Sequence, residues 1–196
     1  MSVPCKYAKE AALVAHYDSH PDYYSPAPGV VPKLCEMLEF ELTGRRRALD
    51  VGCGDGRLSL WLAQQYGMRV TGVDYSRVRI QSALNHAARQ NLACEFLCSD
   101  LHAFLDESPG QFDLVALFEV LEHLENPESV VSRCRGLLGP DGVVLGSLPI
   151  NMPYEAHLQV FETIDDVIRR FHPHRIARDE RHWYCVWRKE EGPSHC

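Results

Sequence analysis

The sequence has little of what nucleic-acid-binding or membrane-spanning proteins need. Acidic residues outnumber basic ones, 27 against 20, which gives a formal net charge of −7. Proteins that hold long nucleic acids carry a basic surface, so this balance argues against that class. No segment approaches the roughly 18 consecutive apolar residues of a membrane span, and no long apolar stretch of a secretory signal follows Lys6 and Lys9. We therefore expect a cytoplasmic protein with no membrane partner.

Cysteines are present, but they show no pattern of a disulfide framework or a zinc knuckle. The chain has eight cysteines, and none forms a Cys-x-x-Cys pair. Several of them, such as Cys94 and Cys98, lie in apolar runs, where a thiol acts as a small hydrophobic side chain. This usage is typical of proteins kept in a reducing compartment, in agreement with a cytoplasmic location.

Apolar segments alternate between strand-like and helix-like spacing from Arg47 onward. The strand-like segments are Ala48–Val51, Arg69–Asp74, Cys94–Cys98, Phe112–Phe118 and Val143–Leu148. The helix-like segments are Leu58–Gln65, Ser76–Gln90, Leu101–Leu105 and Pro127–Leu138. Short apolar strands that alternate with helices predict a parallel sheet covered by helices on both faces.

The last part of the chain departs from this alternation. A helix is predicted over Glu162–Phe171, with Thr163 as its N-cap. Two strand-like runs follow within a few residues of each other, Arg175–Glu180 and Trp183–Lys189, and predict a hairpin. The predicted fold class is α/β: a doubly wound, Rossmann-like sheet of five parallel βα units, closed by a C-terminal antiparallel hairpin.

A glycine-rich turn follows the first predicted strand. The segment Leu49-Asp50-Val51-Gly52-Cys53-Gly54-Asp55-Gly56 joins that strand to the first helix. Glycine lets the backbone turn sharply, and it lets a ligand approach where a Cβ would block it. In a doubly wound sheet this turn lies in the crevice at the carboxyl ends of the strands, where ligands bind. Alone, the turn fits a tight strand-to-helix connection without a ligand equally well.

Acidic residues at the ends of the next two strands point to an adenosine ligand. Asp74 ends the second strand, 22 residues after Gly52, where a carboxylate can accept both ribose hydroxyls. Tyr75 follows it and is assigned to the same site. Asp100 ends the third strand, where it can accept the adenine amino group, and Leu101 can supply backbone and apolar contact. Three such features at fitting intervals are much stronger evidence than the glycine turn alone.

The glycine spacing separates two classes of cofactor. The dinucleotide fingerprint requires a third glycine where this chain has Arg57. Asp50 is poorly placed beside a pyrophosphate, but it is well placed to help orient the amino group of an amino-acid cofactor. S-adenosylmethionine carries such a group and NAD does not. We therefore predict S-adenosylmethionine, with Gly52 and Gly54 at its site.

Residues 47–165 resemble the class I S-adenosylmethionine-dependent methyltransferases, in particular those that act on small molecules. The matching segments are Ala48-Leu49-Asp50-Val51-Gly52-Cys53-Gly54-Asp55-Gly56, Val70-Thr71-Gly72-Val73-Asp74, Ser99-Asp100, Phe112-Asp113-Leu114-Val115, Glu119-Val120-Leu121-Glu122-His123-Leu124 and Leu137-Leu138-Gly139-Pro140-Asp141-Gly142. The family usually has Lys-Pro-Gly-Gly in the last turn, so Gly139-Pro140-Asp141-Gly142 departs from it mildly. The motifs are specific to cofactor and fold and say little about the substrate.

The resemblance also implies how the chain is organised. Residues 44–196 would form the methyltransferase domain, and residues 1–43 an N-terminal helical cap over the active site. Within the cap, Tyr17 and Tyr24 are candidates for contact with the substrate. Phe118, the last residue of the predicted fourth strand, is expected to line the pocket of the transferred methyl group.

The segment after the fourth strand carries the candidate catalytic residues. Glu119, Glu122 and His123 stand at i, i+3 and i+4, so they share one face if a helix starts here. A loop after the fifth strand adds His157, with Asn151 as a further candidate substrate contact. Strand ends four and five adjoin the cofactor crevice in this fold, so this loop can lie over the methyl group.

Three interpretations of these residues stay open. In the first, His123 is a general base, supported by Glu119, and no metal is present. In the second, Glu119, Glu122, His123 and His157 hold a divalent cation such as Mg²⁺. A resemblance to the ubiquinone-pathway O-methyltransferases and the small-RNA 3′-end 2′-O-methyltransferases implies that cation. In the third, these residues only cap a helix and fix a loop.

These observations predict an enzyme that methylates a small-molecule acceptor, with oxygen favoured over nitrogen. We expect a monomer or a homodimer that binds no nucleic acid. Two other classes remain open: a metal-dependent methyltransferase of RNA 3′ ends, and a non-catalytic subunit that binds the cofactor and activates a partner. The acid–base cluster argues against the second of these.

Overall fold

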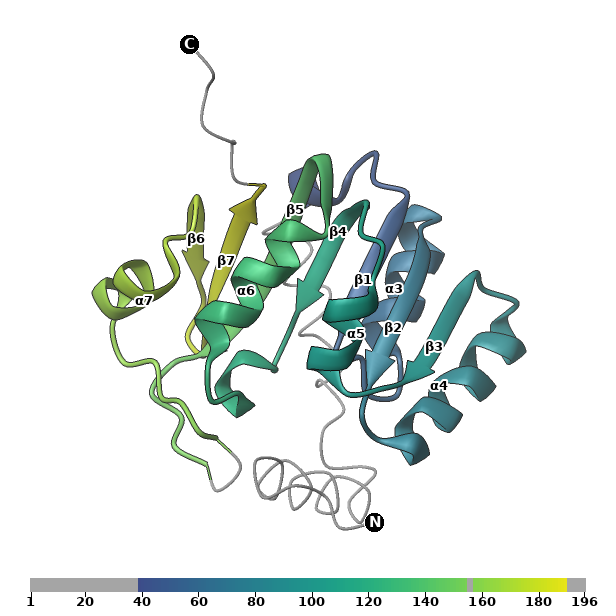
Figure 1. Ribbon diagram of the computed structural model, residues 1–196, viewed down its shortest axis with the longest axis horizontal. Coiled ribbons are helices and arrows are strands. Elements are labelled where there is room, and N and C mark those ends of the chain that lie inside the picture. The colour runs from purple at the N-terminus through teal and green to yellow at the C-terminus, as the bar shows by residue number, and fades with distance from the viewer. Residues whose placement is uncertain (1–38, 155–156, 190–196) are drawn as a thin grey trace.

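The computed structural model describes residues 39–154 and 157–189. Its strands form one sheet of seven in the order β3-β2-β1-β4-β5-β7-β6 (Figure 1). The strands are β1 Arg47–Val51, β2 Arg69–Asp74, β3 Cys94–Cys98, β4 Phe112–Leu117, β5 Leu138–Pro149, β6 Arg175–Arg178 and β7 His182–Arg188. Strands β1 to β5 are parallel, whereas β7 runs antiparallel to β5 and to β6. The predicted fold class is confirmed.

Helices cover both faces of the sheet. They are α3 Arg57–Tyr66, α4 Arg77–Gln90, α5 Leu101–Glu107, α6 Pro127–Gly136 and α7 Ile164–Phe171. Helices α3 and α4 pack on one face, and α5, α6 and α7 pack on the other. Successive strand residues point to opposite faces, so Ala48 joins the core beneath α3 and Leu49 joins the core beneath α6. The strands are therefore buried on both sides, as their continuous apolar runs predict.

The strand order reverses between β1 and β4. The chain runs outward from β1 to β3 and then returns to place β4 on the other side of β1. Loops leave the carboxyl ends of β1 and β4 in opposite directions at such a switch point, and the crevice between them binds ligands in doubly wound sheets. The fold thus brings the segment after β1 and the segment after β4 to the same place.

Polar N-caps start several helices. Ser76, Asn126 and Thr163 precede α4, α6 and α7, and each side chain accepts a hydrogen bond from the backbone N–H three residues on. Such bonds satisfy N–H groups that have no partner within the helix. The N-cap predicted at Thr163 is confirmed.

The fifth strand is longer than predicted. It spans Leu138–Pro149 and includes the four residues 139–142, which we expected to form a turn outside the strand. The pairing shows why: Phe112 of β4 pairs with Leu138 and Leu114 pairs with Val143, so residues 139–142 bulge out between two paired positions. All other predicted strands and helices agree with the structure to within two residues at each end.

Most of the predicted N-terminal cap lies outside the described residues. Of residues 1–43 the structure describes only 39–43, and residues 39–42 are helical. The predicted substrate contacts Tyr17 and Tyr24 also fall outside the described part. Among the helices of residues 39–154 and 157–189, none has both the length and the apolar character needed to cross a bilayer.

Candidate active site

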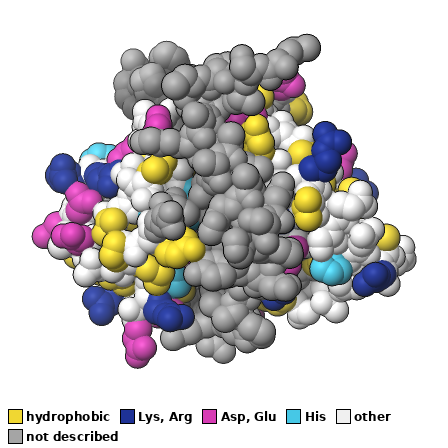
Figure 2. All heavy atoms as spheres, turned by 90° about the horizontal axis from the view of Figure 1, so that it is seen from below, with side chains coloured by type: hydrophobic (Ala, Val, Ile, Leu, Met, Phe, Trp, Pro, Cys, Tyr) yellow, Lys and Arg dark blue, Asp and Glu magenta, His cyan; other side chains and the backbone are white. Residues whose placement is uncertain are grey.

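The predicted cofactor residues lie along one edge of the sheet. The parallel strands end at the lower edge in Figure 1, which faces the viewer in Figure 2. Gly52 directly follows β1, Asp74 is the last residue of β2, and Phe118 directly follows β4. Asp100 comes two residues after β3. One edge thus collects four segments that are far apart in the sequence.

The glycine turn has the geometry that its sequence predicts. Gly52 and Gly54 have φ angles of 66° and 53°, in the left-handed region that favours glycine. The backbone N–H of Gly52 donates to the Val73 carbonyl oxygen at 2.8 Å, which fixes the turn against the end of β2. A Cβ at Gly52 would lie 2.6 Å from Cγ2 of Val120, in the segment after β4. Only glycine fits at position 52 without displacing its neighbour.

Replacement of Gly52 by alanine should therefore destabilise the fold through backbone strain and steric overlap. We expect the free energy of unfolding to fall by about 2–4 kcal/mol, the sum of the two contributions, measured by urea denaturation. Gly67→Ala is the matched control, because Gly67 has a φ of 63° and a Cβ added there would point into open space. It should lose only about 1 kcal/mol. Equal losses in the two variants would contradict the close contact with Val120.

Asp74 is held between the glycine turn and the start of α4. Its Oδ2 accepts from the Gly54 N–H at 2.9 Å and its Oδ1 from the Ser76 N–H at 2.8 Å. The carboxylate is half-buried at this edge of the sheet. This geometry supports the predicted ribose contact. Tyr75, next in the chain, is exposed at the same edge.

The other predicted adenosine contacts also lie near this edge. Asp100 caps α5, because its Oδ1 accepts from the Ala103 N–H at 2.9 Å. Leu101 is half-buried and packs against the core beneath α5 and α6. Phe118 packs partly against the opposite core, beneath α3. Their roles toward adenine and the methyl pocket stay predictions.

Asp50 is turned into the fold. Its side chain is 2% exposed, and its Oδ2 accepts from the Ser59 hydroxyl of α3 at 2.6 Å. Burial, and to a lesser degree the charge of Asp74, raise the pKa of Asp50 to about 7. The hydrogen bond from Ser59 opposes this shift but does not cancel it. An influence of this carboxyl on the cofactor's amino group would therefore act through the backbone of the turn.

The raised pKa of Asp50 makes stability depend on pH. The folded chain holds this proton more tightly than the unfolded chain, so wild-type stability falls as pH rises from about 4 to about 7. Asp50→Asn keeps an acceptor for Ser59 and has no such proton. Relative to this variant, the wild type should lose about 2–3 kcal/mol of unfolding free energy between pH 5 and pH 8, measured by urea denaturation. A difference that stays constant with pH would contradict the assignment.

The segment after β4 does not form an α-helix. Glu119, Glu122 and His123 were expected to share one face only if a helix started here. Glu119 has a φ of 55°, which interrupts any helix, and only a short 3₁₀ turn follows at Leu121–His123. The side chain of Glu119 contacts Ser147 of β5 and His182 of β7. Glu122 and His123 form a separate group with His157. The four residues predicted to act together are thus divided into two neighbouring clusters.

The second cluster consists of Glu122, His123 and His157. One oxygen or nitrogen of each lies within 4.8 Å of those of the others, and the two imidazole rings stack edge to face at 5.0 Å between centroids. His123 Nε2 lies 3.7 Å from Glu122 Oε1. The Glu122 carbonyl oxygen accepts from the N–H groups of Leu158 and Gln159, at 2.7 and 3.0 Å. These bonds attach the loop after β5 to the turn after β4, and so bring in His157.

The protonation of this cluster follows from its burial. Glu122 is fully buried, and neither of its carboxylate oxygens has a hydrogen-bond partner among the described residues. Burial raises the pKa of Glu122 well above its usual range, and the charge of Glu119 adds to the effect. Burial therefore favours the protonated, neutral form of Glu122. His157 Nδ1 lies 2.8 Å from the Met152 carbonyl oxygen, to which it donates, and this bond fixes the orientation of the ring.

Two residues next to Glu119 were missed in the sequence. His182 begins β7 and Ser147 lies in β5, and both contact the Glu119 carboxylate. The predicted strand began at Trp183, so His182 fell in the short connection of the hairpin and was not considered as a site residue. The signal that could have found it is topological: a hairpin that closes the sheet beside β5 returns its turn to the edge where the parallel strands end. Asn151, by contrast, is exposed in the loop after β5, and no described side chain of the two clusters bonds to it.

Comparisons with known proteins identify the family of the chain. Residues 49–146, half of the chain, match the family described as "Methyltransferase domain". The ubiquinone biosynthesis O-methyltransferase of Coxiella burnetii is 34% identical over 153 residues, which are 74% of this chain and 64% of the relative. That of Bordetella avium is 35% identical over 142 residues, 71% of this chain and 58% of the relative. The matched region is thus less than two thirds of the length of these relatives.

Solved structures show the same fold. The Burkholderia thailandensis 1,6-didemethyltoxoflavin-N1-methyltransferase, with bound 1,6-didemethyltoxoflavin and S-adenosylhomocysteine, superposes with a TM-score of 0.75 at 22% identity over 97% of this chain and 92% of that one. The magnesium protoporphyrin IX methyltransferase of Synechocystis, with bound S-adenosylmethionine, gives 0.62 at 19% identity over 92% of each chain.

The chain belongs to the methyltransferase domain family and has the fold of methyltransferases solved with S-adenosylhomocysteine or S-adenosylmethionine. The described residues fit this cofactor. The Cβ position of Gly54 in the turn is nearly open, with only Arg79 Nη1 near it at 3.8 Å, and Asp74 presents an acceptor that two backbone N–H groups hold in place.

Proposed function

We propose that this enzyme transfers the methyl group of S-adenosylmethionine to an oxygen atom of a small-molecule acceptor, with His123 as the general base. The observation that carries the proposal is that the segment bearing His123 packs against the cofactor turn through Val120. The His123 N–H donates to the Val120 carbonyl oxygen at 3.0 Å, and the Val120 side chain packs on Gly52. The turn that bears His123 is thus seated directly on the glycine turn.

The relatives and the charge of the chain support this choice of acceptor. The Coxiella and Bordetella relatives are named O-methyltransferases of ubiquinone biosynthesis, which is a small-molecule pathway. The net charge of −7 is unfavourable for an RNA substrate. A protein that methylates a hydroxyl group must remove its proton, and a buried acid–imidazole pair next to the cofactor turn is suited to that task.

Bound S-adenosylmethionine supplies an electrophilic methyl group together with its leaving group. The chain's own residues then have two tasks, alignment of the acceptor and removal of its proton. Alignment can lower the barrier by about 7–11 kcal/mol, and a placed base adds about 10²–10⁴-fold in rate. When His123 accepts the proton, the adjacent Glu122 gains a positive neighbour 3.7 Å away. A carboxyl group at this distance can stabilise the imidazolium.

A divalent cation is a second form of the same proposal. Glu122, His123 and His157 fit a cation, because they combine a buried carboxylate without a hydrogen-bond partner among the described residues with two imidazoles. Such an ion would polarise and orient the acceptor oxygen. One carboxylate with two imidazoles suits a transition metal better than Mg²⁺, which prefers oxygen ligands. Glu119, a predicted fourth ligand, is instead bonded to Ser147 and His182.

The test is methyl transfer from S-adenosylmethionine labelled in its methyl group. We expect label in catechol, a small compound with two hydroxyl groups, and none in aniline or in a short RNA. Activity that survives a chelator supports the base without a metal, and activity that is lost and restored by added Mn²⁺ or Mg²⁺ supports the cation. Label in aniline alone or at the RNA 3′ end would overturn the proposal. Cofactor binding without transfer to any of a panel of phenols would favour a non-catalytic subunit.

A further inference from the structure

Glu119 is held in an unusual position by β5. It is a non-glycine residue with a φ of 55°, a conformation that costs energy and is often kept at functional sites. Its N–H donates to the Ser147 hydroxyl oxygen at 3.0 Å, and that hydroxyl donates in turn to Glu119 Oε1 at 2.6 Å. The buried Ser147 therefore fixes both the backbone and the side chain of Glu119.

The hairpin supplies a second partner to the same oxygen. His182, the first residue of β7, places Nε2 3.2 Å from Glu119 Oε1, and its Nδ1 lies 3.8 Å from Asp179 Oδ1. Asp179 is itself fixed: Oδ1 accepts from the N–H groups of Arg181 and His182 at 2.7 and 2.8 Å, and Oδ2 accepts from the Tyr184 hydroxyl at 3.0 Å. The His182 imidazole thus lies between the carboxylates of Glu119 and Asp179, and hydrogen bonds to Asp179 hold the turn between β6 and β7 in place.

The charges of this group reinforce one another. Partial burial would raise the pKa of Glu119, but hydrogen bonds from His182 and Ser147 and the charge of His182 outweigh it and lower that pKa. Burial, together with the charge of Arg181, would lower the pKa of His182. The hydrogen bond and charge of Glu119 and the charge of Asp179 outweigh these effects, so the pKa of His182 is raised. The charged form of Glu119 is therefore favoured, whereas burial favours the neutral form of the nearby Glu122.

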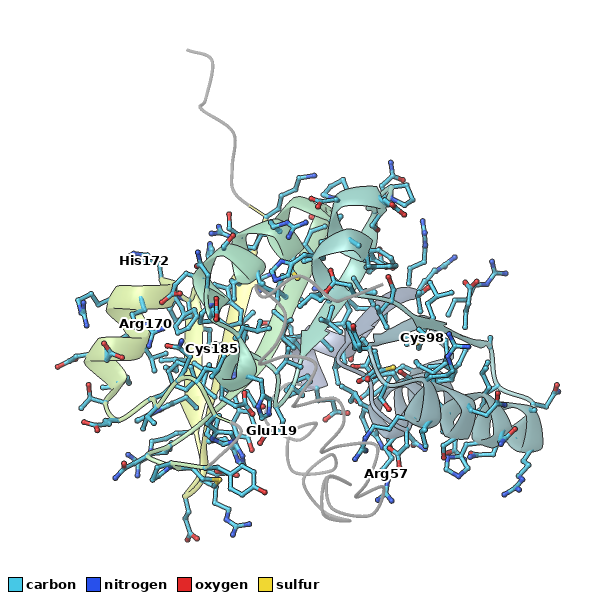
Figure 3. The ribbon with its side chains drawn as sticks, turned by 60° about the horizontal axis from the view of Figure 1, so that its bottom comes forward. Arg57, Cys98, Glu119, Arg170, His172 and Cys185 are labelled. Carbon is cyan, nitrogen blue, oxygen red and sulfur yellow. The ribbon has the colours of Figure 1, made fainter. Side chains whose placement is uncertain are left out.

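One oxygen of this carboxylate is open. Oε1 accepts from both Ser147 and His182, whereas no described residue donates to Oε2. The Glu119 side chain is 45% exposed and His182 only 10%. Figure 3 shows Glu119 at the edge where the parallel strands end. Its partners belong to β5 and β7, which lie on the other side of β4 from β1 and β2, the strands that carry Gly52 and Asp74.

We propose that His182, fixed by Asp179, is a positioning residue that aims the Glu119 carboxylate, and that Glu119 Oε2 binds a hydrogen-bond donor on the methyl acceptor. The donor is a hydroxyl or an ammonium group, the chemistry that an ionised carboxylate with a free oxygen recognises. The location of Glu119 on the β5 side of the edge assigns it to the acceptor rather than to the adenosine. This inference rests on the proposed function, because it presumes a small acceptor beside His123.

The first test compares two replacements of His182 in the full chain. His182→Phe keeps a ring but donates nothing, whereas His182→Gln keeps an N–H donor for Glu119. With catechol as acceptor, we expect His182→Phe and Glu119→Gln to raise the KM at least tenfold, the effect of losing a hydrogen bond to a charged group. The dissociation constant of S-adenosylhomocysteine should change less than twofold. His182→Gln should restore the KM to within about threefold of wild type.

A second measurement does not depend on turnover. In the chain with ¹⁵N-labelled histidine and bound S-adenosylhomocysteine, the His182 signal is identified by its loss in His182→Phe. We expect Glu119→Gln to shift this signal at a fixed neutral pH. Addition of catechol should shift it in the wild type and leave it unchanged in Glu119→Gln. His86→Phe, a replacement on α4, is the control that should alter neither the KM nor these shifts.

These results separate the inference from the function on which it rests. An unchanged KM in His182→Phe, or equal losses in the Phe and Gln variants, would overturn the positioning role. If the His182 signal does not shift in Glu119→Gln, the contact between His182 and Glu119 is refuted. If catechol does not shift it in the wild type, the contact between Glu119 and the acceptor is refuted. Catechol-dependent shifts without any labelled methyl transfer to catechol would leave this inference standing and would count against the proposed O-methylation instead.

Discussion

Asp74→Ala is expected to raise the dissociation constant of S-adenosylhomocysteine roughly 100-fold or more. The carboxylate is predicted to accept two ribose hydroxyls, and each hydrogen bond to a charged group contributes about 1.5–3 kcal/mol. The same carboxylate also holds the Gly54 N–H at 2.9 Å, so its removal loosens the glycine turn as well. Isothermal titration calorimetry of the full chain measures the effect directly.

A matched control separates ligand binding from the loss of backbone hydrogen bonds. Asp113 accepts from the N–H groups of Arg46 and Arg47, at 2.8 and 2.9 Å, just as Asp74 accepts from two backbone donors. It does so at the start of β1, the opposite end of the strand from Gly52. Asp113→Ala should therefore destabilise the fold and leave the affinity for S-adenosylhomocysteine within about twofold. Unchanged affinity in Asp74→Ala would refute the ribose contact.

His123→Ala is expected to abolish turnover while it leaves cofactor binding nearly intact. Loss of a general base costs about 10²–10⁴-fold in kcat. The backbone bond from the His123 N–H to the Val120 carbonyl does not involve the imidazole, so the packing of this turn on Gly52 should persist. Label transfer to catechol gives the rate, and calorimetry with S-adenosylhomocysteine gives the binding.

The companion variant His157→Ala distinguishes the two forms of the proposal. If His123 acts as a base without a metal, His157→Ala should lose far less activity, because its Nδ1 bond to the Met152 carbonyl serves only to place the loop. If both imidazoles bind a cation, the two variants should lose activity together, and added metal should not restore it. Full activity of His123→Ala would remove that residue from the mechanism.

The cofactor side of this site could be predicted from the sequence because its rules are local. The carboxyl end of each parallel strand lies at one edge, so Gly52, Asp74 and Asp100 follow from strand ends that apolar runs reveal. The acceptor side depends on features that such runs do not carry. A positive φ at Glu119 turned its side chain away from Glu122, and no residue-type preference signals that conformation for glutamate. Its partner His182 belongs to a hairpin. The position of that hairpin depends on the pairing of β7 with β5, which a local sequence pattern does not reveal.

The same reasoning explains the error at β5. Glycine and proline at positions 139–142 indicate a turn by their local preferences. Pairing with β4 on both sides of them overrides that preference and keeps Leu138 within the strand. The alternation of apolar residues in this stretch gave no warning, because a bulge interrupts it.

The antiparallel pairing of β7 with β5 has a consequence for biosynthesis. Every residue from Val143 to Pro149 has a partner in β7, so β7 pairs with the edge of β5 that faces away from β4. Until residues 182–188 have left the ribosome, β5 is an unpaired edge strand, and such strands readily pair with other chains. A nascent chain arrested before the hairpin should therefore be aggregation-prone and should require a holdase, although its cofactor turn is already complete.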